Sequence, residues 1–272
     1  MGTPLFAAQV LENCIKSGVS FSGIVTSPDK PQGRGYNLKK TPVKEIAEKH
    51  DIPCYQPNNK EQLCQLLRIE KPELSIVVAY GMIFPDNIVD EYLLINLHAS
   101  LLPSYRGSSP IQSAILNGDK IMGVTLICID HQVDSGDIID QEQFTVEDKD
   151  NLESISTKMI RQGAALISKQ LLLPLDNWSF KPQKHEQATF TKKIKKQDGE
   201  IDFKIDTPEL IIKKIKAFYP WPGVYCFKNN KRIKICEATL ENGQIIINKV
   251  QVEGKRPVSY QSYCAGNTPL IY

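Results

Sequence analysis

The sequence predicts an α/β protein with a Rossmann-like, doubly wound parallel sheet domain at 1–180, a basic linker at 181–200 and a small OB-like β-barrel domain at 201–272. Strand and helix patterns alternate over the first two-thirds of the chain, which is typical of a parallel sheet covered by helices. The apolar runs there are short and nearly unbroken, as in strands buried on both faces. After Trp221 only strand patterns follow, and these indicate a small barrel.

The elements of the first domain follow from local patterns. A first helix is indicated by apolar residues that recur on one helical face, at Leu5, Ala8, Leu11 and Ile15. A second begins at Thr41-Pro42, an N-cap residue followed by proline at the first helical position. Strands are expected at 21–26, 74–80, 93–98, 123–129 and 137–144. Two more helices are expected, one at 110–116 closed by Gly118 and a long amphipathic one at 152–173.

The pattern changes after the long helix. Residues 174–197 contain prolines, polar residues and a basic run, so we interpret this stretch as a linker. A further helix begins at Thr207-Pro208 and ends near Phe218. Strands at 224–227, 232–238 and 245–252 complete the predicted barrel.

The two parts of the chain carry opposite charge. Residues 181–272 contain 17 Lys and Arg against 9 Asp and Glu, a net charge of +8, whereas residues 1–180 contain 16 against 22, a net charge of −6. A basic tail on an acidic body suggests that the tail meets a polyanion. A basic surface without a partner explains the charge equally well, so charge alone does not show whether the tail binds a polyanion.

The cysteines indicate a reducing compartment. All seven are scattered singly without a C-x-x-C pair, which argues against a disulfide framework and against a zinc site. No uncharged apolar run is long enough for a membrane span, and no signal peptide is visible. We therefore expect a cytoplasmic protein, or one in an equivalent reducing organelle matrix, with no membrane partner and no metal, and we expect a monomer.

Two polar residues stand at the end of an apolar strand. Asn96 and His98 lie two residues apart and so point to the same side, whereas Ile95 and Leu97 point to the other. Open α/β sheets bind their ligands at the carboxyl ends of the strands. A lone histidine in such a place is more often satisfied by nearby backbone, so the residues that follow decide between the two interpretations.

Those residues carry a resemblance. The strand continues as N-x-H-x-S-L-L-P at 96–103, Y-R-G-x-x-P follows at 105–110, and D-S-G-D lies at 134–137. The three motifs span more than forty residues, and together the pattern resembles the signature of the folate-dependent formyltransferases. The resemblance implies a catalytic trio of Asn96, His98 and Asp134, and 10-formyltetrahydrofolate as the formyl donor.

The family's chemistry assigns a role to each residue of the trio. An amine attacks the formyl carbon, and Asn96 and His98 are expected to donate hydrogen bonds to the oxygen that becomes negative. Asp134 is expected to orient His98, raise its basicity and hold a water that relays the proton. The resemblance also implies a folate site, formed by Ser100, Leu101, Leu102, Pro103 and Asp137 and by backbone at Val78, Ala79, Tyr80 and Gly81.

Further features resemble the members of this family that formylate initiator methionyl-tRNA. Gly2-Thr3-Pro4 opens the chain, and residues 217–223 resemble the entry to the C-terminal domain of those members. The loop at 27–35 resembles the one that opens the acceptor stem, with Arg34 as the matching arginine. The tRNA contacts expected on this basis are Arg34, Lys39, Lys40, Lys192, Lys193, Lys195 and Lys196.

The sequence leaves two other classes of function open. Formyltransferases for glycinamide ribonucleotide and for nucleotide-linked sugar amines share the trio, as do formyltetrahydrofolate hydrolase domains, but a small acceptor needs no basic tail. An RNA-binding module that has lost catalysis is a second alternative, against which the intact trio argues.

A turn such as Gly2-Thr3-Pro4 normally follows a central strand. We expect that strand to be missing from residues 1–180 and the natural product to begin several residues upstream of Met1.

Overall fold

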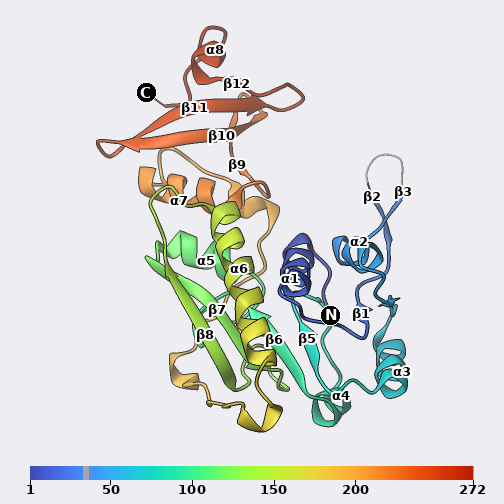
Figure 1. The fold of residues 1–272 in the computed structure, drawn as a ribbon. Helices are drawn as coiled ribbons and strands as arrows, with labels where there is room; N and C mark the ends of the chain where they lie inside the picture. Colours follow the sequence, from blue (N-terminus) through green and yellow to red (C-terminus); the bar gives the residue numbers. More distant parts are fainter. Residues whose placement is uncertain (33–36, 272) are drawn as a thin grey trace. The chain divides into compact units, whose positions relative to one another are not determined.

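The computed structural model describes residues 1–32 and 37–271 (Figure 1). It divides into two compact units. The first comprises residues 1–107, 121–144 and 156–190, and the second comprises residues 108–120, 145–155 and 191–272. The second unit therefore includes two segments from the part of the chain that precedes the basic tail.

Helices and strands are interspersed up to residue 171, and the elements become mostly strands after residue 223. The helices are α1 Leu5–Lys16, α2 Pro42–Lys49, α3 Lys60–Glu70, α4 Asp86–Glu91, α5 Pro110–Asn117, α6 Leu152–Leu171, α7 Pro208–Phe218 and α8 Tyr260–Cys264. The strands are β1 Ile24–Val25, β2 Lys30–Gln32, β3 Asn37–Lys39, β4 Cys54–Tyr55, β5 Ser75–Val77, β6 Leu94–His98, β7 Ile121–Cys128, β8 Ile138–Thr145, β9 Val224–Lys228, β10 Lys231–Glu241, β11 Gln244–Val252 and β12 Val258–Ser259. Short 3-10 turns lie at Leu175–Asn177, His185–Gln187 and Lys196–Gly199.

The sheet of the first unit is mixed rather than wholly parallel. Its order is β5-β6-β7-β8, with β5 parallel to β6 and β7 antiparallel to β6. A separate pair, β1 and β4, is parallel. The expectation of a Rossmann-like α/β domain is confirmed, but the expectation of a purely parallel sheet is wrong at β7. Whether a strand runs parallel or antiparallel to its neighbour cannot be predicted from its composition here. Strand β7 is antiparallel, yet it is as continuously buried as a central parallel strand.

Residues Met1 and Gly2 lie between β1 and β5. The N–H of Gly2 donates to the carbonyl of Val25 at 3.0 Å, and the N–H of Val78 donates to the carbonyl of Met1 at 2.8 Å. Gly2 also forms a parallel bridge with Val78. Strands β1 and β5 belong to different sheets, so they do not pair directly with each other. Met1 and Gly2 thus link the backbone of β1 to the backbone at the end of β5.

The first helix has a different buried face from the predicted one. Its buried residues are Ala7, Ala8, Val10, Leu11 and Cys14. Leu5 is 60% exposed, because it lies in the first turn beyond the edge of the core. Ala8 and Leu11 were correctly placed, but the stripe runs through Cys14 rather than Ile15.

The predicted helix ends are confirmed where a cap residue marks them. Thr41 and Thr207 each accept a hydrogen bond from the backbone N–H three residues later, at 3.2 Å in both helices. Gly118 closes α5 in the left-handed conformation, with φ 84°. Cap positions are predictable because they depend on local chemistry alone.

The second unit contains an open sheet rather than a closed barrel. Its four strands are ordered β12-β11-β10-β9, and β10 pairs antiparallel with both β9 and β11. Helix α7 packs on β9, β10 and β11 and also contacts α5. Within residues 1–32 and 37–271 no pairing joins β9 to β12, so the predicted OB-like barrel is not confirmed. An OB-fold uses five strands, and here β12 has only two residues.

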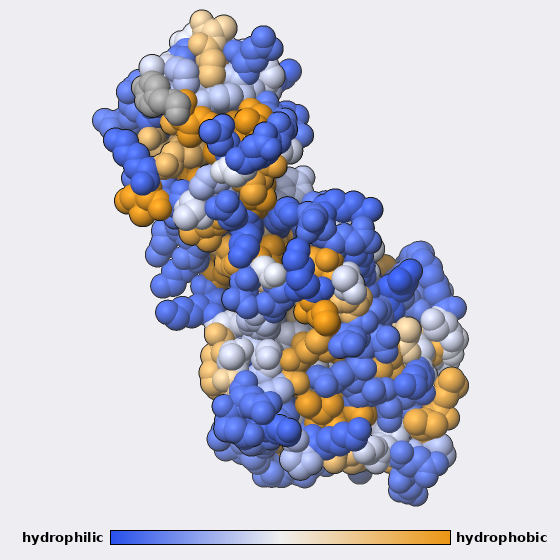
Figure 2. All heavy atoms as spheres, turned by 90° about the vertical axis from the view of Figure 1, so that its left-hand side faces the viewer, coloured by the Kyte–Doolittle hydropathy of each residue, from blue (hydrophilic) through white to orange (hydrophobic). Residues whose placement is uncertain are grey.

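The face of the molecule drawn in Figure 2 is mainly hydrophilic. On the face drawn in Figure 2, apolar side chains form small patches among charged ones. None of the helices in the described part of the chain has an apolar stretch of the length that a membrane crossing requires.

Candidate active site

Strand β6 carries Asn96 and His98 at its carboxyl end. Val77, the last residue of β5, pairs with Asn96, so the ends of the two parallel strands lie side by side. His98 is buried, with 6% of its surface exposed, and Asn96 is partly exposed. The two residues stand at the sheet edge at which open α/β sheets bind their ligands.

Asp134 reaches this edge from the loop between β7 and β8. Its backbone is left-handed, with φ 54°, which turns its side chain toward the strand ends. Oδ1 accepts from Nδ2 of Asn96 at 3.4 Å, and Oδ2 accepts from the backbone N–H of Gly107 at 2.8 Å. The structure therefore brings Asn96, His98 and Asp134 together, from positions that are 38 residues apart in the chain at most.

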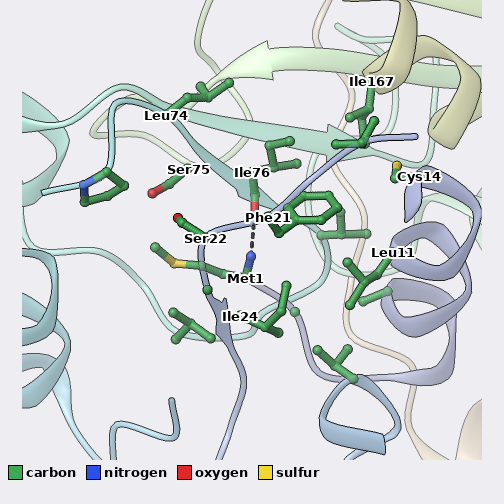
Figure 3. A pocket seen from close by; sticks show the side chains of 18 of the residues that line it. Met1, Leu11, Cys14, Phe21, Ser22, Ile24, Leu74, Ser75, Ile76 and Ile167 are labelled. Carbon is green, nitrogen blue, oxygen red and sulfur yellow. Dashed lines mark hydrogen bonds between the residues drawn. The ribbon is translucent and has the colours of Figure 1, made fainter. Parts of the chain in front are cut away.

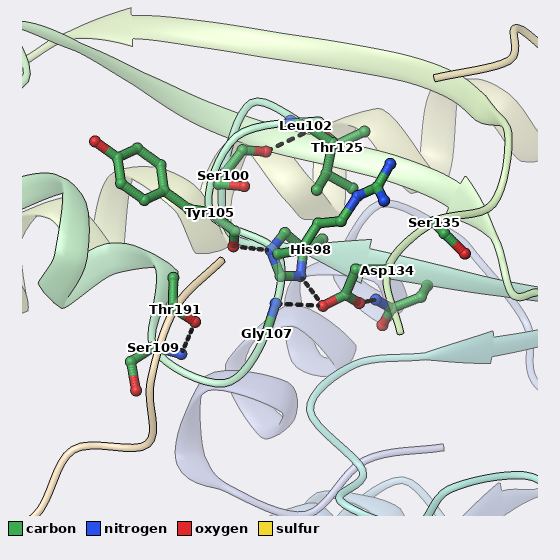
Figure 4. Close-up of polar contacts among 12 residues, drawn as sticks. His98, Ser100, Leu102, Tyr105, Gly107, Ser109, Thr125, Asp134, Ser135 and Thr191 are labelled. Atoms are coloured by element: carbon green, nitrogen blue, oxygen red, sulfur yellow. Dashed lines mark hydrogen bonds and ion pairs between the residues drawn. The ribbon is translucent and has the colours of Figure 1, made fainter. Parts of the chain in front are cut away.

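The ring of His98 lies between two acceptors (Figure 4). Nε2 is 2.9 Å from the carbonyl oxygen of Tyr105, which can only accept, so Nε2 carries the proton of this hydrogen bond. Nδ1 then faces Asp134, whose Oδ2 is 3.5 Å away. Nδ1 is therefore the nitrogen that can exchange a proton near the carboxylate.

The segment Ser100–Pro103 follows β6 as a loop held by internal hydrogen bonds. The hydroxyl of Thr125 donates to the carbonyl of Ser100 at 2.6 Å and accepts from the N–H of Leu102 at 3.0 Å. Gln141 donates to the carbonyl of Leu102 at 2.9 Å. The peptide bond between Leu102 and Pro103 is cis. The hydroxyl of Ser100 donates to the carbonyl of Ser104 at 2.6 Å, so it is not paired with His98 as a nucleophilic serine would be.

The segment Val78–Gly81 follows β5 at the same edge of the sheet. Val78 and Tyr80 are buried, whereas Ala79 and Gly81 are exposed and have φ values of 48° and 80°. Burial raises the pKa of the Tyr80 phenol to about 12. The backbone of this segment is therefore exposed at Ala79 and Gly81, while the side chains of Val78 and Tyr80 belong to the core. Asp137, beyond the Asp134 loop, is partly buried, and its carbonyl accepts from the N–H of Cys128 at 2.9 Å.

Two residues that sequence reasoning did not assign support the site. Gln183 is buried, and its amide donates to the carbonyls of Asp134 at 2.9 Å and Gly136 at 2.7 Å. Its oxygen accepts from the guanidinium of Arg106 at 2.6 Å, and the same guanidinium is 3.1 Å from Nδ1 of His185. Arg106 stood in the Y-R-G motif and was therefore detectable. Gln183 lies 49 residues beyond Asp134 in a stretch interpreted as linker, where no local signal marks it.

The expected tRNA-contacting residues are on exposed segments. Lys39 lies in β3, and Lys40 pairs with Glu48 at 2.6 Å. Four more lysines are exposed in the basic run of the second unit, at Lys192, Lys193, Lys195 and Lys196. Arg34 lies outside the described residues.

The trio joins an amide donor, an imidazole and a carboxylate at the end of one strand. Such a set stabilises a developing negative oxygen with N–H donors and moves a proton through the imidazole. Among residues 1–32 and 37–271, no group of three or more His, Cys, Asp and Glu side chains is arranged to hold a metal ion. Acyl-type transfer by electrostatic and acid–base means is the chemistry that these groups support.

The fold and the site define a group transferase built on an open α/β sheet. A model of the formyl transferase family matches residues 1–171, and a model of the formyl transferase C-terminal domain matches residues 193–244. The chain therefore belongs to the formyl transferase family.

Relatives agree with this assignment. The methionyl-tRNA formyltransferase of Sulfurihydrogenibium sp. (strain YO3AOP1) is 39% identical over 245 residues, which cover 88% of this chain and 78% of the relative. That of Helicobacter pylori (strain J99 / ATCC 700824) is 38% identical over 296 residues, covering 98% and 95%. A solved methionyl-tRNA formyltransferase from Clostridium thermocellum has a TM-score of 0.59 at 20% identity and covers 85% of this chain and 99% of its own, which shows a shared fold.

Proposed function

We propose that this chain transfers the formyl group of 10-formyltetrahydrofolate to the free amino group of methionine on initiator tRNA, giving N-formylmethionyl-tRNA for translation initiation. The observation that carries the proposal is the cluster of Asn96, His98 and Asp134 at the end of β6, joined by the contacts of 3.4 and 3.5 Å. The names of the relatives support the choice of acceptor.

The reaction forms one C–N bond and breaks another. The donor supplies a formyl carbon, which the amine nitrogen attacks while the carbonyl oxygen takes up negative charge. Asn96 Nδ2 and the imidazole of His98 are assigned as the hydrogen-bond donors to that oxygen. The attacking nitrogen loses a proton, and the nitrogen of the donor gains one as its bond to the formyl carbon breaks. Asp134 holds the imidazole and, through a water, passes this proton on.

The residues proposed to hold the folate fit a flat heterocycle with a long substituent. Exposed backbone at Ala79 and Gly81 offers N–H and C=O groups to the ring. The loop Ser100–Pro103 is fixed by Thr125 and Gln141, so the site is formed before the ligand binds. Leu101 and Pro103 are partly exposed in this loop and offer apolar contact.

Binding of the tRNA substrate is assigned to the basic residues. Arg34, Lys39 and Lys40 are proposed to contact the acceptor stem, and the exposed lysines 192–196 are proposed to contact phosphates. All seven cysteines are unpaired, which supports a reducing compartment such as the cytoplasm. A monomer stays a prediction that gel filtration tests.

A formylation assay tests the function. The chain is mixed with 10-formyltetrahydrofolate and methionyl initiator tRNA, and formylmethionine is measured after deacylation. A parallel reaction offers a nucleotide-linked amino sugar instead of tRNA. Formylation of the tRNA alone supports the proposal, and transfer to the sugar, or to neither acceptor, overturns it.

A further inference from the structure

Gln183 contacts the backbone of the loop between β7 and β8, which carries Asp134. Its side-chain amide donates to the carbonyl oxygens of Asp134 at 2.9 Å and of Gly136 at 2.7 Å. Gln183 is buried, with 5% of its surface exposed, and it belongs to the same compact unit as the loop. Both hydrogen bonds go to backbone atoms, so they fix the path of the loop around Asp134.

Arg106 sets the orientation of the Gln183 amide. The guanidinium donates to Oε1 of Gln183 from Nε at 3.2 Å and from Nη2 at 2.6 Å. A guanidinium has no acceptor, and a backbone carbonyl has no donor. Oε1 must therefore face Arg106, and Nε2 must face the loop. A glutamate at this position would offer the acceptor but would lack the two N–H donors.

Arg106 also lies between the two residues that hold the reacting groups. The carbonyl of Tyr105 accepts from Nε2 of His98 at 2.9 Å, and the N–H of Gly107 donates to Oδ2 of Asp134 at 2.8 Å (Figure 4). The side chain of Arg106 reaches the backbone of Asp134 a second time, through the buried glutamine amide. His98 and Asp134 are therefore fixed to each other by a closed chain of contacts.

The carboxylate of Asp134 depends on this support for its contacts within the trio. The φ of Asp134 is 54°, in the left-handed region that is uncommon for residues other than glycine. Its oxygens lie 3.4 Å from Nδ2 of Asn96 and 3.5 Å from Nδ1 of His98. Both distances are at the long end of the range for a hydrogen bond. A small movement of the loop would therefore separate the carboxylate from both partners.

We propose that Gln183 is a positioning residue for formyl transfer. With its orientation set by Arg106, it holds the loop so that the carboxylate of Asp134 stays in contact with Asn96 and His98. The inference rests on the proposed function and deepens it, because it adds to the trio a residue that acts through Asp134. A misplacement of about 1 Å can lower turnover by roughly 100-fold, so loss of the two bonds to the loop lowers kcat.

Substitutions at Gln183 test the two donors. Gln183→Glu keeps the length of the side chain and an acceptor for Arg106, and it removes both N–H groups. We expect kcat to fall roughly 10- to 100-fold while the KM for the formyl donor stays within about twofold. Gln187→Glu is the matched control, because Gln187 is exposed in the same segment, and it should change neither constant.

Gln183→Met separates the loss of the donors from the added charge. It lacks the N–H groups as Gln183→Glu does, and it carries no charge, so it should lower kcat over the same range. A normal kcat in Gln183→Met would overturn the proposal, because the charge alone would then explain the effect of the glutamate.

A double-mutant cycle shows whether Gln183 acts through Asp134. In a chain that already carries Asp134→Asn, Gln183→Met should lower the single-turnover rate by less than about twofold, because the carboxylate that it positions is gone. Losses that multiply would overturn the proposal, because Gln183 would then support the protein independently of this carboxylate.

A readout without turnover separates this inference from the proposed function. The NMR signals of the ring nitrogens of His98 depend on the hydrogen bonds of the imidazole. These signals should shift in Gln183→Met, whereas those of His50, which pairs with Glu12 at 3.1 Å, should not. Unchanged His98 signals would overturn the inference. Absence of formylation by the unmodified chain would overturn the proposed function instead, and the His98 signals would still show whether Gln183 positions Asp134.

Discussion

His98 owes its orientation to acceptors on both sides of its ring. The Tyr105 carbonyl fixes Nε2 at 2.9 Å, and the left-handed backbone of Tyr105, with φ 63°, aims that carbonyl at the ring. Asp134 is in turn held by the Gly107 N–H at 2.8 Å and, through its carbonyl, by Gln183 at 2.9 Å. The position of a single proton therefore depends on residues from three separate segments, around Tyr105 and Gly107, around Asp134 and around Gln183.

Replacing His98 by alanine removes the imidazole and leaves its neighbours in place. We expect His98→Ala to lower kcat by roughly 100-fold or more, the scale of one acid–base or oxyanion group, with little change in tRNA affinity. Single-turnover formylation measures this. His131→Ala is the matched control, because His131 is exposed and pairs with Asp86 and Asp90. Near-normal turnover in His98→Ala would contradict the assignment.

The amino group of Met1 is buried and donates to the carbonyl of Ile76, as the dashed line in Figure 3 shows. This amine links stability to pH. Its pKa is about 5 in the folded chain and 8.0 when free, so between these values the unfolded state binds more protons. Unfolding free energy should therefore fall as pH is lowered from 8 to 5, by roughly 4 kcal/mol at most, and should show no further loss from this group below pH 5.

Chemical unfolding of the chain and of its N-acetylated form, at several pH values in this window, isolates the effect. Acetylation makes the nitrogen an amide that does not titrate, so the difference between the two forms should be greatest at pH 5 and vanish near pH 8. A difference that is constant with pH would show that the amine is solvated.

Whole elements differ in how well local sequence predicts them. Helices with a threonine cap and strands with unbroken apolar runs, such as β6, are confirmed because their signals are local. Strand β4 and helix α3 were not predicted: β4 has two residues, and α3 buries only Leu63 and Leu67. The family resemblance of the motifs grouped Asn96, His98 and Asp134, and the structure brings the three together. The Gln183 contacts were not predicted, because they depend on where a distant segment folds.

Close approach of β7 and β8 depends on Gly123. A Cβ at this position would lie 2.1 Å from the carbonyl oxygen of Glu142 and 2.7 Å from Cδ2 of Leu101, and the backbone oxygen has little freedom to move. We expect Gly123→Ala to lower the unfolding free energy by about 1–3 kcal/mol or more. It should also raise the KM for the formyl donor, because Leu101 belongs to the proposed folate loop.

Urea unfolding and steady-state kinetics check both effects. Gly266→Ala is the matched control, because a Cβ at Gly266 would meet nothing within 4 Å. If Gly123→Ala is as stable as the control, β7 and β8 do not approach as closely as the structure indicates.

At the scale of the whole molecule, the two parts of the chain carry opposite net charges. The total of +2 hides a difference between −6 in residues 1–180 and +8 in residues 181–272. An acidic body repels a polyanion, so the attraction must come from local clusters of cations. The densest run is at 192–196, where four exposed lysines surround one isoleucine.

Salt dependence tests whether this run contacts phosphates. Each neutralised phosphate contributes roughly 0.7–0.9 to the slope of log affinity against log salt concentration. We therefore expect tRNA affinity to fall steeply with salt, and we expect replacement of Lys192 and Lys193 by alanine to reduce the slope by about 1.4–1.8. Lys16→Ala with Lys149→Ala is the matched control, because both lysines are exposed and already paired with glutamates. Equal slopes for the two double variants would place the phosphate contacts elsewhere, since both remove two positive charges and differ only in where those charges lie.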